Sequence, residues 1–172
     1  MSKALEILIF SVIFLSGISA FEIPVFKQWD PRWANIKLGT SSMTFAQEGC
    51  LVTSITSMIA GTGGRIDGRR PSPPLLNLWL LSHDGYVNGD DFVWASINQL
   101  GYRFEGKVRN ISEMIDAMRR GKFLILNVNK GGHYVFATGR KGNAFVVMEP
   151  GHSNRITYDD QEVVSASIYT KV

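Results

Sequence analysis

Apolar and polar positions divide the chain into a helical first half and a strand-rich second half. A helix that starts after Cys50 is expected to end at Gly61, where glycine readily adopts the left-handed conformation of a helix stop. Helical spacing or helix-start residues predict three further helices, and apolar runs predict five strands. The first strand is expected at a sheet edge because it contains proline. The helices are expected at 73–81, about 91–100 and 110–121, and the strands at 22–26, 123–128, 134–138, 145–148 and 163–169.

This order of elements indicates the fold class. Helices that precede a set of antiparallel strands are typical of an α+β domain. The helix starts have recognisable signals: Pro73 and Pro74 open one, and Asn110 followed by Glu113 has the pattern of a capping box. We therefore predict one α+β domain without internal repeats.

Residues 1–20 have the pattern of a secretory signal peptide. Lys3 precedes an apolar run over 7–18, and small residues lead to Ala20, after which cleavage is expected. The run is shorter than the roughly 20 apolar residues of a spanning helix, although an uncleaved membrane anchor is the alternative. The prediction is a secreted or extracellular domain over 21–172, at the cell surface or in a periplasm where one exists.

Charge narrows the class of partner. The chain has 18 Lys and Arg residues against 15 Asp and Glu, a formal net charge of +3. Nucleic-acid binding usually requires clustered basic residues, so this small, scattered excess excludes it as the expected function. We expect a monomer with no stable membrane span after signal cleavage.

Cys50 is the only cysteine, and it directly precedes a predicted helix. A single cysteine in an exported chain cannot form an intramolecular disulfide. A helix N-terminus favours the thiolate, which is the nucleophilic form of cysteine. Cys50 is therefore predicted to be a catalytic nucleophile.

A thiol nucleophile needs a base, and the chain has three histidines. His83 lies at the polar end of a predicted helix and is interpreted as a surface residue, whereas His152 follows a Pro-Gly turn and stays a candidate. His133 is the preferred base because it begins a predicted strand whose hairpin partner ends near Glu149. A carboxylate beside a histidine can fix its tautomer and stabilise its positive charge.

The hairpin geometry supports this pairing. A three-residue loop over 140–142 would place Ala137 opposite Phe145 and His133 opposite Glu149, with their side chains on one face. A register shift of one residue would instead place Glu149 on the other face.

Two glutamines are candidates for an oxyanion donor, because acyl transfer needs N–H groups directed at the developing negative charge. They are Gln28 and, close to the nucleophile in sequence, Gln47. The histidines and the cysteine lack the spacing of a zinc site, and no phosphate-binding loop is present. No metal and no other cofactor is expected.

Five segments of the chain together resemble one known family. They are 24–34, 38–39, 49–54, 132–135 and 149–151. These segments are similar to the bacteriocin-processing-peptidase-like branch of the papain-fold cysteine peptidases, and the similarity extends over nearly all of the chain after the signal segment. The resemblance implies a papain-like fold, Cys50 as nucleophile, His133 as base, position 149 as the orienting acid and Gln28 as the oxyanion glutamine. Relatives usually carry aspartate where this chain has Glu149.

Two functions are consistent with this reading. The first is a thiol hydrolase that cleaves a peptide, protein or peptidoglycan-peptide substrate through an acyl-enzyme. The second, suggested by glutamate at 149, is an inactive peptidase-fold module that binds a peptide or cell-wall fragment. Acyl transfer to an amine instead of water cannot be distinguished from hydrolysis by sequence.

Overall fold

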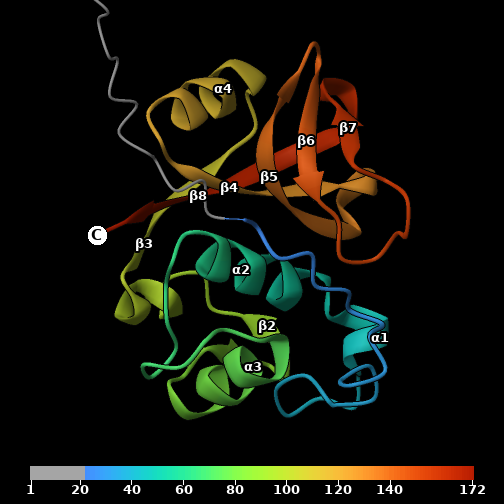
Figure 1. Ribbon diagram of the computed structural model, residues 1–172, viewed down its shortest axis with the longest axis vertical. Coiled ribbons are helices and arrows are strands. Elements are labelled where there is room, and N and C mark those ends of the chain that lie inside the picture. The colour runs from blue at the N-terminus through green and yellow to red at the C-terminus, as the bar shows by residue number, and fades with distance from the viewer. Residues whose placement is uncertain (1–21) are drawn as a thin grey trace, which may run out of the picture.

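A six-stranded antiparallel sheet with helices on both faces forms the centre of the protein (Figure 1). The computed structural model describes residues 22–172, so the predicted signal segment 1–20 lies outside the described residues. The spatial order of the strands is β3-β8-β4-β5-β6-β7. Their bounds are β3 Tyr102–Val108, β4 Phe123–Val128, β5 His133–Lys141, β6 Ala144–Met148, β7 Thr157–Asp159 and β8 Val163–Lys171. The predicted α+β class is confirmed.

Residues 22–172 contain four α-helices, which lie on both sides of the sheet. They are α1 Phe45–Glu48, α2 Cys50–Gly61, α3 Pro73–Ser82 and α4 Ile111–Arg119, and three 3-10 turns lie at Ser96–Leu100, Asn129–Gly131 and Asp160–Glu162. The predicted end of α2 at Gly61 and the proline start of α3 are confirmed. Asn110 caps α4 by accepting a hydrogen bond from the Ser112 amide. Within residues 22–172, no helix has the length and apolar character needed to cross a membrane.

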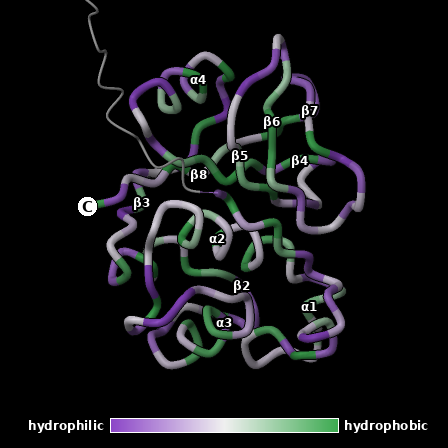
Figure 2. The backbone as a smooth tube through the Cα atoms, in the orientation of Figure 1, coloured by the Kyte–Doolittle hydropathy of each residue, from purple (hydrophilic) through white to green (hydrophobic). Residues whose placement is uncertain are grey.

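The sheet separates two hydrophobic cores. Successive residues of a strand point to opposite faces, so Leu124 and Leu126 pack toward α4, whereas Ile125 packs toward α2 and α3. Figure 2 shows the hydrophobic residues along helices and strands and the hydrophilic ones mainly in outer loops. Helix α2 lies between the sheet and α3, which explains why ten of its residues are buried.

Two predicted elements are wrong. Residues 91–100 do not form one helix: β2 (Asp91–Phe92) pairs with β1 (Tyr86–Val87), and only Ser96–Leu100 is helical, as a 3-10 turn. The cause is the turn between the two short strands, where Asn88 and Gly89 both have positive φ. Residues 22–26 do not form a strand either, since they have no ladder partner.

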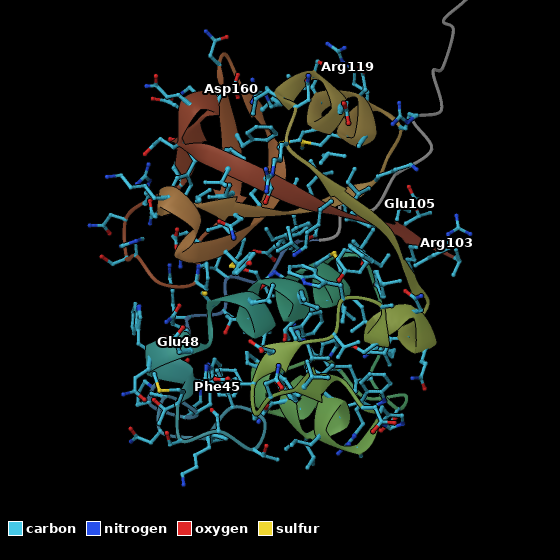
Figure 3. All side chains as sticks on the ribbon, turned by 180° about the vertical axis from the view of Figure 1, so that it is seen from behind. Phe45, Glu48, Arg103, Glu105, Arg119 and Asp160 are labelled. Atoms are coloured by element: carbon cyan, nitrogen blue, oxygen red, sulfur yellow. The ribbon has the colours of Figure 1, made fainter. Side chains whose placement is uncertain are left out.

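Edge strand β3 was not predicted, although its alternating pattern is visible in the sequence. Tyr102 is buried and Phe104 partly buried, whereas Arg103, Glu105 and Lys107 are exposed. Figure 3 shows Arg103 and Glu105 on this strand, at the margin of the sheet. Charged side chains on an edge strand discourage pairing with other chains. Strand β7, helix α1 and the β1–β2 hairpin were also not predicted.

The central position of α2 leads to a stability prediction. Ile55 is fully buried in α2, so Ile55→Ala should lower the free energy of unfolding by about 2–5 kcal/mol through lost burial and a cavity. Ile156 is 67% exposed, and Ile156→Ala should change it by less than about 0.5 kcal/mol. Urea unfolding of both variants measures the difference. Equal effects would contradict the central role of α2.

Candidate active site

Cys50 begins helix α2, with Gly49 as the N-cap. Its side chain is buried and forms no disulfide. The first amides of a helix have no partner inside the helix and present partial positive charge. One turn later, Ser54 Oγ donates a hydrogen bond of 3.1 Å to the carbonyl oxygen of Tyr134. This bond fixes the start of α2 against strand β5.

His133 begins β5, immediately before Tyr134. Its Nε2 lies 2.7 Å from Oε1 of Glu149. The Cys50 side chain is also close enough to the ring to raise the pKa of His133. Because Nε2 faces the carboxylate, Nδ1 is the ring nitrogen left to exchange a proton with the sulfur. The imidazole is thus a neighbour of both the thiol and the carboxylate.

The hairpin that carries His133 and Glu149 has a different register from the predicted one. The expected pairing of Ala137 with Phe145 is wrong, because Ala137 pairs with Val147 and the loop has two residues instead of three. A bulge after Ala137 shifts the register within the hairpin. The side chains of His133 and Glu149 meet beyond the last paired residues of the ladder, and not as a directly opposed pair.

The Glu149 carboxylate is buried and fully hydrogen-bonded. Its Oε1 accepts from the backbone amides of Gly151 (2.7 Å) and His152 (3.1 Å) as well as contacting His133. Its Oε2 accepts from the Tyr158 hydroxyl at 2.7 Å. These donors stabilise a charge that burial would otherwise make costly. The longer side chain of glutamate is therefore held in a defined place.

The same contacts determine the charges in the site. Burial lowers the pKa of His133, but its hydrogen bonds to Cys50 and Glu149 and their negative charges outweigh burial and raise this pKa above its usual range. Burial raises the pKa of Glu149, but hydrogen bonds from His133, Tyr158 and the Gly151 amide outweigh it and lower this pKa. Both shifts favour an imidazolium beside a carboxylate.

The two candidate oxyanion glutamines lie in different places. Gln28 is buried, its Nε2 donates to the Ala46 carbonyl oxygen at 3.0 Å, and its backbone amide donates to Pro150. It therefore lies between the segment before Cys50 and the turn after Glu149. Gln47 is exposed and directs its Oε1 to the amide and hydroxyl of Thr44 as a helix cap. The structure brings Gln28 to the site and turns Gln47 away from it.

Gly151 permits close packing at this point. A Cβ atom at this position would lie 2.9 Å from His133 Cε1 and 3.2 Å from Gln28 Oε1. Both distances are tighter than ordinary contacts, so a side chain here would push the imidazole or the amide away. Glycine after Pro150 allows the turn to press directly against the imidazole.

The remaining histidines differ in their relation to the site. His83 follows α3, is half-buried and stacks on Trp79 with 4.1 Å between ring centroids. No hydrogen bond or ring contact in the described part of the chain joins it to Cys50, His133 or Glu149. His152 is exposed and lies edge-on to His133. Ligand-type atoms of His133, Glu149 and His152 lie within 4.8 Å of one another. Both Glu149 oxygens already accept hydrogen bonds, which suits an orienting acid better than a metal ligand.

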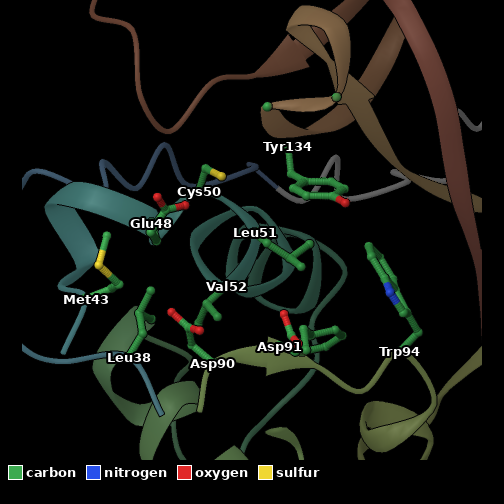
Figure 4. A pocket seen from close by; sticks show the side chains of 13 residues that line it. Leu38, Met43, Glu48, Cys50, Leu51, Val52, Asp90, Asp91, Trp94 and Tyr134 are labelled. Atoms are coloured by element: carbon green, nitrogen blue, oxygen red, sulfur yellow. The ribbon is translucent and has the colours of Figure 1, made fainter. Parts of the chain in front are cut away.

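A groove of about 650 Å³ opens beside Cys50. Figure 4 shows Cys50 at its margin, with Tyr134 on one side and the β2 segment on the other. The lining combines apolar, aromatic and acidic side chains with two glycines. It consists of Leu38, Met43, Glu48, Cys50, Leu51, Val52, Asp90, Asp91, Phe92, Trp94, Gly131, Gly132 and Tyr134. An open groove next to a nucleophile provides room for an extended chain.

Sequence reasoning missed several residues that build the site. Tyr158 lies on the unpredicted strand β7, and no local pattern connects it with Glu149. Lys27 Nζ donates to the carbonyl oxygens of Glu149 and His152, and Trp29 Nε1 donates to that of Gly151. In this segment, sequence analysis identified Gln28 as a site residue but not Lys27 or Trp29. The Asn-Gly turn before Asp90 was the available signal for the acidic side of the groove.

Comparison of the chain with family models, curated proteins and solved structures finds no match. The site is therefore interpreted from its own geometry.

The pKa shifts predict a pH range of maximal stability. The pKa of His133 is raised from 6.5 to about 9, so the stability that its protonated form contributes is complete below pH 6.5 and is lost as pH rises through 9. The pKa of Glu149 is lowered from 4.5 to about 2, so the stability that its ionised form contributes is complete above pH 4.5 and is lost as pH falls through 2. Thermal unfolding should show a plateau of stability between these limits, and Glu149→Gln should show a smaller dependence of stability on pH. In the same variant, the pKa of His133 measured by NMR titration should move toward 6.5. An unchanged His133 titration would contradict the coupling.

Tyr158→Phe tests the support of the carboxylate. Removing the hydroxyl leaves Oε2 of Glu149 without its donor, so the pKa of Glu149 should rise. The free energy of unfolding should fall by about 1–3 kcal/mol. Tyr102→Phe is a matched control, because this buried tyrosine donates to the Ile59 carbonyl oxygen instead. Urea unfolding and carboxyl NMR titration should show lost stability in both variants and a changed Glu149 titration only in Tyr158→Phe. A similar Glu149 titration in the two variants would contradict the role of Tyr158.

Proposed function

We propose that this protein is a thiol hydrolase that cleaves a peptide or related amide bond, with a papain-like arrangement of its α+β fold. The observation that carries the proposal is the His133 ring, which bonds the Glu149 carboxylate at 2.7 Å and neighbours the Cys50 thiol, next to an open groove. A nucleophile, a base and an orienting acid in series are the parts that covalent acyl transfer requires. A helix that begins with the nucleophile and packs on an antiparallel sheet supports the papain-like assignment.

Acylation follows from this geometry. His133 Nδ1 takes the thiol proton, and the thiolate attacks the substrate carbonyl carbon. The Cys50 amide, at the start of α2, and the Gln28 side chain are the donors for the negative oxygen. His133 then gives its proton to the leaving amine as the carbon–nitrogen bond breaks. Glu149 stabilises the imidazolium throughout.

Deacylation uses the same residues. Water enters after the amine leaves, and His133 accepts one of its protons as the oxygen attacks the thioester. Collapse of the intermediate releases the carboxylic acid and returns the proton to sulfur. An amine in place of water would give acyl transfer with the same groups. The substrate class is a peptide, a protein or a cell-wall cross-bridge, and the proposed place of action is outside the cell.

The main argument for the alternative function, an inactive binding module, is weakened by the contacts of Glu149. It was suggested by glutamate in place of aspartate, but the Glu149 carboxylate still lies 2.7 Å from His133 and is held by three other donors. The longer side chain is accommodated because it turns back toward the amides of its own turn. This contact favours the hydrolase over an inactive module.

The reactivity of Cys50 tests the proposal. At pH 5.5, iodoacetamide should alkylate Cys50 at least about 10-fold faster than a small free thiol, because a neighbouring imidazolium stabilises the thiolate. Glu149→Gln should slow this alkylation, whereas His83→Ala should leave it unchanged, because His83 stacks on Trp79 and is not among the residues that line the groove.

Turnover provides the second measurement. Mass spectrometry of a peptide library should show cleavage by the wild type and none by Cys50→Ala, and His133→Ala should lower the rate about 100-fold or more. Alkylation of folded Cys50 at the rate of an ordinary thiol, together with no cleavage, would refute the hydrolase.

A further inference from the structure

The groove beside Cys50 is lined by acidic side chains and by no basic ones among the described residues. Three of its lining residues are carboxylates, namely Glu48, Asp90 and Asp91, and no lysine, arginine or histidine is among the described residues that line it. Figure 4 shows Glu48 near Cys50, and Asp90 and Asp91 on the β2 side of the groove. The chain as a whole has a net charge of +3. The negative potential is therefore a local property of this groove.

These carboxylates have no internal counterion among residues 22–172. Asp90 Oδ2 accepts a hydrogen bond from Ser41 Oγ at 3.0 Å, and Asp91 Oδ2 accepts one from Asn88 Nδ2 at 3.2 Å. Both donors are neutral, and no salt bridge is formed by any of the three acids in the described part of the chain. Acids elsewhere on the surface, such as Asp30 and Asp160, are paired with arginine. The three carboxylates of the groove therefore remain available to pair with a cationic group of a ligand.

The other walls of the groove suit the rest of a cationic side chain. Trp94 packs against Phe92 and Tyr134, with ring centroids 5.5 and 5.7 Å apart. Aromatic faces attract ammonium and guanidinium groups. Lys107, which does not line the groove, already places its Nζ 4.2 Å from the Trp94 ring centroid. Leu51 adds an apolar surface on which an alkyl stem can lie.

We propose that this groove selects substrates with a cationic side chain, of the lysine or arginine type, close to the scissile bond. The inference rests on the proposed function, since it names the substrate class of the same site. Asp90 and Asp91 contact the charged group, Leu51 and the aromatic wall contact its stem, and Glu48 extends the negative surface toward Cys50. A volume of about 650 Å³ accommodates one or two residues of an extended peptide.

Matched alkylating peptides test this selectivity without requiring turnover. One pair carries a chloromethyl ketone at the C-terminal end and lysine or norleucine next to it, and a second pair carries an iodoacetyl group at the N-terminal end. Norleucine has nearly the length of lysine but no charge. With a chelator present and at low salt, the lysine reagent of at least one pair should modify Cys50 about 10-fold faster than its norleucine partner. Added salt should reduce this ratio.

Isosteric variants assign the effect to the groove. The double variant Asp90→Asn/Asp91→Asn keeps the acceptors for Ser41 and Asn88 and should bring the ratio close to one. Asp116→Asn on α4, on the other face of the sheet, should leave the ratio unchanged. Thermal unfolding checks that each variant is folded, and the salt dependence of the wild type tests the proposal without any variant.

The outcomes separate this inference from the proposed function. Equal rates for the lysine and norleucine reagents of both pairs, or a ratio that survives the double substitution, would overturn the cationic selectivity. Rapid alkylation by plain iodoacetamide would still support the hydrolase in that case. Conversely, a lysine preference with slow alkylation by all reagents would support the cationic groove and count against the catalytic thiolate.

Discussion

The candidate site depends on one contact between a helix and a strand. Ser54 and Tyr134 join α2 to β5, with Cys50 one helical turn before Ser54 and His133 one residue before Tyr134. The packing that buries α2 against the sheet therefore also sets the separation of the thiol from the imidazole. A small rotation or shift of α2 would change that separation, so the chemistry requires the rigidity of the core. The buried apolar residues of α2 supply this rigidity.

The second requirement is electrostatic. A buried imidazolium and carboxylate are unfavourable unless their remaining polar atoms are satisfied. The turn after β6 meets this requirement with two backbone amides, and Tyr158 meets it with its hydroxyl. Glutamate at 149 is compatible with this turn because its side chain is long enough to reach His133 while accepting from the amides two and three residues ahead. Support of the acid thus comes from local backbone and from one distant strand.

The predictable features were those with local signals. A cysteine before an apolar helical run, Gly61 as its end and the apolar strands over 123–128 and 163–169 could be recognised without tertiary information. The bulge in β5 could not, because sheet contacts determine it, and the predicted register was wrong although His133 and Glu149 do lie together. Tyr158 was missed because its partner is nine residues away across an irregular loop. The Asn-Gly turn was a local signal for the β1–β2 hairpin, and the alternation of residues 102–108 was one for β3.

The segment at 27–29 joins the start of the described chain to the turn at 149–152. Lys27, Gln28 and Trp29 form four hydrogen bonds to backbone carbonyl oxygens at 149–152, although the two segments are more than 120 residues apart in sequence. These residues have no place in a sheet, and the turn that presents the acid accepts four of their hydrogen bonds, beside the bond from Gln28 to Ala46. Ile23 and Phe26, just before this segment, pack against the hydrophobic core, so tension on this part of the chain would load the core and the turn together. A displacement of residues 27–29 would shift the turn that holds Glu149, which mechanically couples the start of the described chain to the charge of His133.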